Sequence, residues 1–129
     1  MVLLYEKIGL NLVPSKYSVR LDNIPAEGDV MVLSEEINIS KTNELTKEEN
    51  TTLLDSDIKF YVRLQESNSD HNTVIGDLIG IYESLKNMEG STYSGNFIIS
   101  VSGVRGPTYL GRDSDSTIYS MLLRVQYTV

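Results

Sequence analysis

The chain has 129 residues, 40% of them hydrophobic and 22% charged, which is enough for one domain over residues 1–129 with a modest core. Its 18 acidic and 11 basic residues give a net charge of −7. This balance argues against specific nucleic-acid binding and against anionic membrane surfaces, because both attract clustered cations. The absence of cysteine excludes disulfides, thiol catalysis and thiolate metal sites.

The N-terminal third of the chain predicts one short helix and two strands. Over residues 2–12 apolar side chains recur every four residues, which is a helical spacing, although the first residues could equally open a strand. Pro14 ends this pattern. Alternating apolar and polar residues predict a strand at 16–21. A turn containing Pro and Gly then leads to a second strand at 30–33, which could continue to residue 39.

Residues 34–55 form the least regular part of the sequence. They are rich in Glu, Asn, Thr and Lys, and they predict a long polar loop with one helical turn around residues 44–49. Such a loop is either a solvated excursion or an arm that orders on assembly. The sequence leaves both interpretations open.

The clearest strand and the longest helix follow. Residues 57–65 alternate strictly, which places Ile58, Phe60, Val62 and Leu64 on one face of a strand. Ser69 or Asp70 is the expected N-cap of a helix that runs to about Met88. Two glycines four residues apart, Gly76 and Gly80, indicate a side of this helix that a neighbouring backbone could approach closely. The expected apolar stripe of the helix consists of Val74, Ile75, Leu78, Ile79, Tyr82 and Leu85.

The C-terminal region predicts two more strands joined by a loop. The first covers residues 96–103, with Phe97, Ile99 and Val101 on one face, and the last covers 117–129. Residues 104–116, which include Gly106, Pro107 and Gly111, predict the loop. The element order is therefore α-β-β-β-α-β-β. The fold class it indicates is α+β, with a single mixed or antiparallel sheet of about five strands covered on one face by two helices.

Candidate chemistry is sparse. A Ser-His-Asp triad would have to use the only histidine, His71, which sits beside Asp70 in the first turn of the predicted helix, where a surface or capping role is expected. No spacing of His, Asp and Glu is typical of a metal site. The Gly103–Pro107 stretch lacks the Lys-Ser/Thr of a phosphate loop. We therefore expect no catalytic residue, no metal and no cofactor, and the few large hydrophobic residues argue against a deep small-molecule pocket.

Four segments of the C-terminal half carry a resemblance to a known family. They are FYVR at residues 60–63, the helix end YESL at 82–85, GPTYLGRD at 106–113 and the closing strand YSMLLRVQY at 119–127. Together they resemble the tail-terminator, or minor capsid, proteins of long-tailed bacteriophages and prophages. The last two segments are the specific ones. The N-terminal half fits this family by topology alone, and residues 34–55 are longer than its members usually carry.

The resemblance implies a structural protein of the virion tail or neck, assembled in the bacterial cytoplasm. Tail terminators form a ring, commonly a hexamer, that caps the tail tube, stops its elongation and presents a surface for joining the head. The implied partners are copies of the chain itself, the tail tube protein and a head-tail connector protein. A closed ring needs two different complementary patches on each subunit. The residues we expect at one of these patches are Pro107, Tyr109, Leu110, Arg112 and Asp113.

Two other functions remain open from the sequence. One is a different neck, tail-completion or minor capsid connector protein, which would share the same small α+β design. The other, from a different class, is a small cytosolic hydrolase that uses His71 and Asp70.

Overall fold

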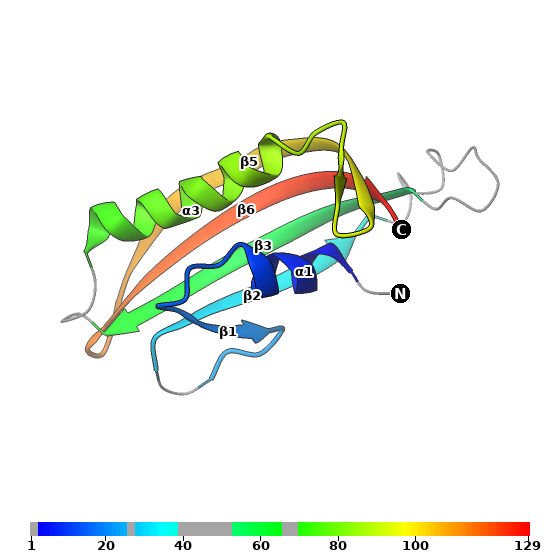
Figure 1. The fold of residues 1–129 in the computed structure, drawn as a ribbon. Coiled ribbons are helices and arrows are strands. Elements are labelled where there is room, and N and C mark those ends of the chain that lie inside the picture. Colours follow the sequence, from blue (N-terminus) through cyan, green and yellow to red (C-terminus); the bar gives the residue numbers. More distant parts are fainter. Residues whose placement is uncertain (1–2, 26–27, 39–52, 66–69) are drawn as a thin grey trace.

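Two helices lie on one face of a single six-stranded sheet (Figure 1). This computed structural model describes residues 3–25, 28–38, 53–65 and 70–129. The elements in chain order are α1 (Leu4–Asn11), β1 (Ser18–Leu21), β2 (Val30–Ile37), β3 (Leu53–Gln65), α3 (His71–Lys86), β4 (Thr92–Tyr93), β5 (Asn96–Asp113) and β6 (Ser116–Thr128).

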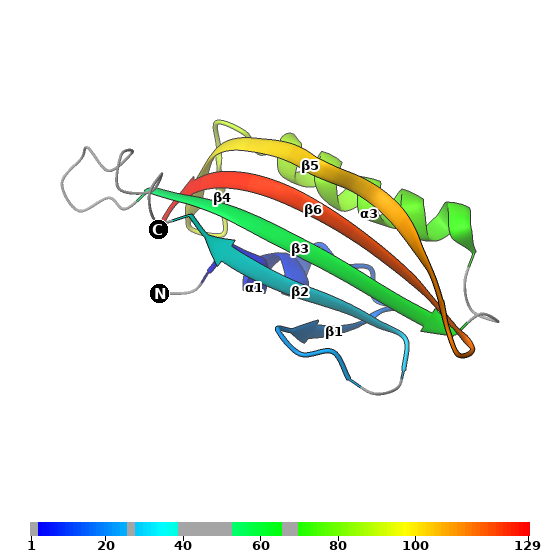
Figure 2. The ribbon, with the colours of Figure 1, turned by 180° about the vertical axis from the view of Figure 1, so that it is seen from behind.

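The sheet is mixed and curls into a half-barrel. Its strand order is β1-β2-β3-β6-β5-β4, with β1 parallel to β2 and every other pair antiparallel. Seen from behind, the sheet turns toward the viewer a face that neither α1 nor α3 covers (Figure 2). The predicted α+β class with one mixed sheet and two helices is confirmed. The count of five strands falls one short, because the two-residue strand β4 was not predicted.

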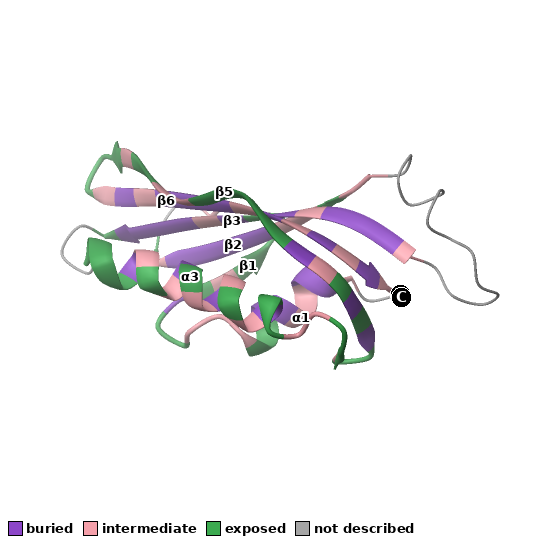
Figure 3. Cartoon of the chain, turned by 90° about the horizontal axis from the view of Figure 1, so that it is seen from above, coloured by how far each residue is buried: buried purple, intermediate pink, exposed green. Residues whose placement is uncertain are grey.

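The pairing of β3 with β6 organises the core. In this register Ile58 lies opposite Leu123 and Phe60 opposite Met121, and each of these side chains is at most 1% exposed. Since side chains alternate along a strand, the even-numbered residues of β3 and the odd-numbered residues of β6 share the helix-covered face. Figure 3 shows buried residues along both strands and on the sheet-facing sides of the helices. The alternation predicted for these two strands is confirmed.

The helix α3 begins where the sequence predicts and buries a slightly different stripe. Asp70 is the N-cap, and its carboxylate accepts a hydrogen bond from the Asn72 amide at 3.1 Å. The buried stripe includes Ile81, which is 2% exposed, whereas Ile79 is 39% exposed. The close approach expected at Gly76 and Gly80 is wrong, because a Cβ at either position would meet nothing within 4 Å.

The predicted loop at residues 34–55 is too long at both ends. Strand β2 continues to Ile37 and β3 already begins at Leu53, so the flanks of this stretch belong to the sheet. Polar residues made these strand ends resemble a loop in the sequence, but Glu35 is half-buried and accepts a hydrogen bond from the buried Ser56. The helical turn predicted at residues 44–49 lies outside the described residues.

The predicted loop at residues 104–116 is wrong. Strand β5 runs without a break from Asn96 to Asp113, and only Ser114 and Asp115 connect it to β6. The predicted facing of its first part is also wrong, since Ile98 and Val101 are buried while Phe97 and Ile99 are exposed. A register shift between Ile98 and Ser100 breaks the two-residue period on which that prediction rested.

A half-buried carboxylate fastens the first helix to the sheet. Glu35 on β2 accepts hydrogen bonds from the Tyr5 amide at 3.1 Å, from the Ser56 hydroxyl at 2.9 Å and from the Tyr127 hydroxyl. The N-cap residue Leu3 makes no side-chain capping bond, so Glu35 supplies the acceptor that the first turn of α1 needs. Burial raises the pKa of both Glu35 and Tyr127.

We predict that Tyr127→Phe lowers the free energy of unfolding by about 2 kcal/mol, because it removes the hydroxyl that donates to Glu35 and accepts from the Leu4 amide. Tyr109→Phe is the matched control, since Tyr109 is 44% exposed, and it should change stability by less than about 0.5 kcal/mol. Urea unfolding of both variants measures the difference. Equal costs would show that the Tyr127 hydroxyl does not hold α1 in place.

A second prediction concerns pH. Because the pKa of Glu35 is raised in the folded protein above its ordinary value of 4.5, ionisation of this group costs folding free energy. This cost is absent at pH values below the ordinary pKa of a glutamate, and it grows as the pH rises through the raised pKa of Glu35 in the folded protein. The stability of the unchanged chain should therefore fall relative to Glu35→Gln as pH rises from 4.5. The exposed neighbour gives the control Glu36→Gln. A pH-independent difference between the unchanged chain and Glu35→Gln would contradict the burial argument.

Candidate functional site

The outer edge of β5 is the longest unpaired strand edge in the part of the chain that the structure describes. Strand β4 covers only its start, through the pairs Thr92–Phe97 and Tyr93–Asn96. The residues after α3 also cover Ile98 and Val101, whose main-chain groups bond Gly90 and Ser91 and the side chains of Lys86 and Glu89. From residue 102 to residue 113 none of the described strands pairs with this edge, which is outermost among the long strands in Figure 1. An open edge of this length offers main-chain and side-chain groups to another protein.

The bulges of β5 turn apolar side chains outward. Relative to β6, the strand carries one additional residue at each of four register shifts. At three of these the additional residue is Ile99, Val104 or Leu110, with exposed fractions of 37%, 49% and 53%. A bulge removes its extra residue from the regular alternation and redirects the side chain. The result is a row of three large apolar side chains exposed along the strand.

An apolar groove of about 260 Å³ lies beside this row, between α3 and β5. Gly103 and Gly106 open it, because a Cβ at either position would meet nothing within 4 Å. Its lining is almost wholly apolar apart from the exposed Glu83 on α3. The groove is lined by Ile79, Tyr82 and Glu83 of α3, Gly103, Gly106 and Pro107 of β5, and Met121 and Leu123 of β6.

The structure places four of the five predicted interface residues on three different surfaces. Pro107 lines the groove, Leu110 belongs to the outward row, and Asp113 lines a separate pocket at the tip of the β5–β6 hairpin. Arg112, next to Asp113, is exposed at the same tip. Leu110 does not belong to the core, because this side chain is 53% exposed.

Tyr109 faces the helix side of the sheet and packs with other rings. Its ring centroid lies 5.4 Å from that of Tyr119 and 6.0 Å from that of His71. His71 in turn lies 5.6 Å from Tyr119, so one histidine and two tyrosines close the N-terminal end of α3 against β5 and β6. The aromatic contacts hold the end of β5 that carries Leu110.

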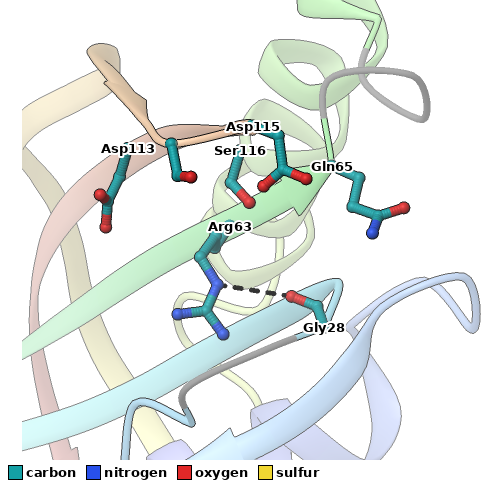
Figure 4. Close-up of a pocket in the computed structure, with 7 residues that line it drawn as sticks. Gly28, Arg63, Gln65, Asp113, Asp115 and Ser116 are labelled. Atoms are coloured by element: carbon teal, nitrogen blue, oxygen red, sulfur yellow. Dashed lines mark hydrogen bonds between the residues drawn. The ribbon is translucent and has the colours of Figure 1, made fainter.

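The hairpin-tip pocket, of about 680 Å³, contains a buried arginine. Arg63 is 8% exposed, and its Nε donates to the Gly28 carbonyl at 3.4 Å. Its guanidinium points toward Gly28 and away from the carboxylates of Asp113 and Asp115 (Figure 4). The Nη2 atom has no hydrogen-bond partner among the described residues, but it is itself fully buried. A ligand in the pocket would not reach this donor, so the pocket is the weaker candidate.

The residues considered for catalysis take other roles. The Asp70 carboxylate caps α3, and the exposed His71 ring packs beside two tyrosines. Within the described ranges no cluster of three or more His, Asp or Glu side chains could hold a metal ion. None of the described helices has the length and apolar character to cross a membrane.

Comparison of the sequence with protein-family models gives no match, and comparison with curated proteins gives none either. The candidate site is therefore defined by its geometry.

Sequence reasoning missed most of the outward row and the groove. It selected Pro107 and Leu110 through the family resemblance, but it placed Ile99 on the same strand face as Val101 and Val104 in a loop. The available signal was the adjacent pair Ile98-Ile99, since two consecutive β-branched residues in an otherwise alternating strand are consistent with a bulge.

The same substitution at these adjacent positions tests the bulge. Ile98 is fully buried, so Ile98→Ala should lower the free energy of unfolding by about 3 kcal/mol. Ile99 is the additional residue of the bulge and is 37% exposed. Ile99→Ala should therefore lower the free energy of unfolding by less than about 1 kcal/mol. Denaturant unfolding of the two variants gives both values. A larger loss at Ile99 than at Ile98 would mean that the bulge is absent.

Proposed function

We propose that this protein is a structural subunit that assembles with copies of itself into a ring at the end of a phage tail tube, as tail terminators do. The observation that carries the proposal is the bulged strand β5, which exposes Ile99, Val104 and Leu110 and whose outer edge no described strand pairs with from residue 102 onward. Monomeric proteins usually protect such an edge with charge, with cover or with a short strand. Here β5 exposes Ile99, Val104 and Leu110 as well as the charged Arg105, Arg112 and Asp113, and the three large apolar side chains favour burial against another protein.

The family-like segments coincide with this edge and its support. The stretch GPTYLGRD forms the second half of β5, and YSMLLRVQY forms most of β6, which pairs with it. In the proposed ring the first segment contacts a neighbouring subunit. The second keeps β5 fixed through its buried residues Tyr119, Met121 and Leu123.

The partners under this proposal are other copies of the chain, the last ring of the tube and the head connector. The ring stops tube growth because it occupies the surface on which the next tube subunit would add. The net charge of −7 is consistent with this role, since DNA passing through a ring should not bind to it.

Electron microscopy of phage particles made without this protein tests the proposal. We expect tails of variable, excessive length that fail to join heads, because nothing ends tube polymerisation. Supplying the unchanged chain in trans should restore uniform, head-joined tails. Uniform tails that still join heads without the protein would rule the function out. Uniform tails that stay detached would instead indicate a connector role.

A further inference from the structure

The face of the sheet that neither helix covers (Figure 2) carries three exposed cations. We call it the open face. Cross-strand partners point to the same face of a sheet, and Lys59 and Tyr61 are odd-numbered residues of β3, so their rows lie on the open face. Arg20 of β1 shares the row of Tyr61, and Arg105 of β5 shares the row of Lys59 and Leu122.

These cations have no carboxylate partner among the described residues. The Arg20 guanidinium donates to the Val19 carbonyl at 3.1 Å, and Lys59 makes no hydrogen bond or ion pair within the described ranges. The Arg105 guanidinium donates to the buried Ser120 hydroxyl at 2.9 Å, which keeps it over the sheet. Three positive charges are thus available to an outside partner.

The acidic side chains of the open face are mostly engaged. Asp57 accepts a hydrogen bond from Arg124 at 2.9 Å. Asp55 is buried and accepts one from Gln126 at 3.1 Å. Glu36 is exposed, and no cation of the described residues pairs with it. The unpaired charges of this face are therefore three cations and one acid.

Apolar side chains fill the space between the cations. Tyr61, Ile118 and Leu122 are half-buried, although no helix lies over them. Aromatic side chains together with arginine are enriched in protein–protein interfaces. The composition of the open face therefore favours a protein as its partner.

The opposite side of the molecule presents acids. Gly76, Ile79 and Glu83 lie opposite the buried stripe of α3, so they form the outward side of this helix. Glu83 is exposed and has no ion pair among the described residues. The exposed N-cap residue Asp70 adds a second negative charge at the start of the helix. Ile79 supplies an apolar contact beside them, since it is 39% exposed.

Two lysines next to α3 do not offset these acids, because each is already paired with another carboxylate. Lys16 contacts Asp77 at 2.6 Å, and Lys86 contacts Glu89 at 3.1 Å. The sheet thus separates unpaired cations on one face from unpaired acids on the other. Within one chain these opposite charges cannot meet, whereas between two chains they can.

We propose that the open face of one copy packs on the outward side of α3 of the next copy. Glu83 of that copy then lies among the three cations, and its Ile79 lies against Tyr61 and Leu122. The contact is head-to-tail and uses two different surfaces, so repetition by rotation can close a ring. The inference rests on the proposed function in that the partner is a second copy of this chain. It adds which surfaces meet.

Charge reversal on each surface tests this contact. One variant, Arg20→Glu with Lys59→Glu, makes the open face negative. A second variant, Gly80→Lys with Glu83→Lys, makes the outward side of α3 positive. None of the four positions is buried, and a Cβ at Gly80 would meet nothing within 4 Å, so both variants should fold. Sedimentation velocity at high protein concentration compares them with the unchanged chain.

We expect the unchanged chain to associate with itself. Each variant alone should associate about tenfold more weakly, because like charges then face each other across the contact. An equimolar mixture of the two variants should associate again. A chain that carries all four substitutions should do the same, since both surfaces of its contact have exchanged sign.

An unchanged chain that stays monomeric throughout, or single-surface variants that associate as strongly as it does, would overturn the contact. Recovery in the mixture without recovery in the chain with four substitutions would overturn it too, because that pattern indicates two open faces in contact. Binding of duplex DNA that Arg20→Glu with Lys59→Glu abolishes would assign the open face to phosphate groups instead. None of these results bears on tail length in particles lacking the protein, so a wrong contact and a wrong function remain distinguishable.

Discussion

The register between β3 and β6 is the constraint on which the rest of the structure depends. It runs unbroken over 13 residue pairs, from Leu53 opposite Thr128 to Gln65 opposite Ser116. A shift by one residue would turn Phe60 and Met121 to the face without helices and remove the surface on which α1 and α3 pack. Polar pairs on the opposite face favour the same register, since Arg124 contacts Asp57 across the strands at 2.9 Å.

In contrast to the regular pairing of β3 with β6, the pairing of β5 with β6 is irregular. Four register shifts let a strand of 18 residues follow a strand of 13, and the surplus residues emerge as exposed side chains. The glycines and the proline of β5 are tolerated because they lie in a strand whose outer edge is unpaired. A smooth β5 would bury or pair these residues and leave no apolar row. The candidate assembly surface is thus a direct consequence of how the sheet ends.

The sequence predicted the elements whose pattern is local. The alternation of β3 and β6, the cap at Asp70 and the α+β class all follow from residue spacing alone. The extent of β5 did not, because Gly103, Gly106, Pro107 and Gly111 are loop residues in most contexts and become strand residues only through pairing with β6. Glu35 was read as part of a solvated loop, because the partners that make it internal come from residues 5, 56 and 127, far apart in the chain. The groove joins α3, β5 and β6 and has no local signature.

Hydrogen exchange along β5 tests the central claim most directly, because that claim is that the edge of this strand becomes covered on assembly. Amides of residues 99–110 would be compared in the dispersed chain and in assembled tails. The account predicts slower exchange in this segment after assembly, while amides of β3, already paired on both sides, change little. Unchanged exchange in residues 99–110, with protection appearing elsewhere, would contradict it.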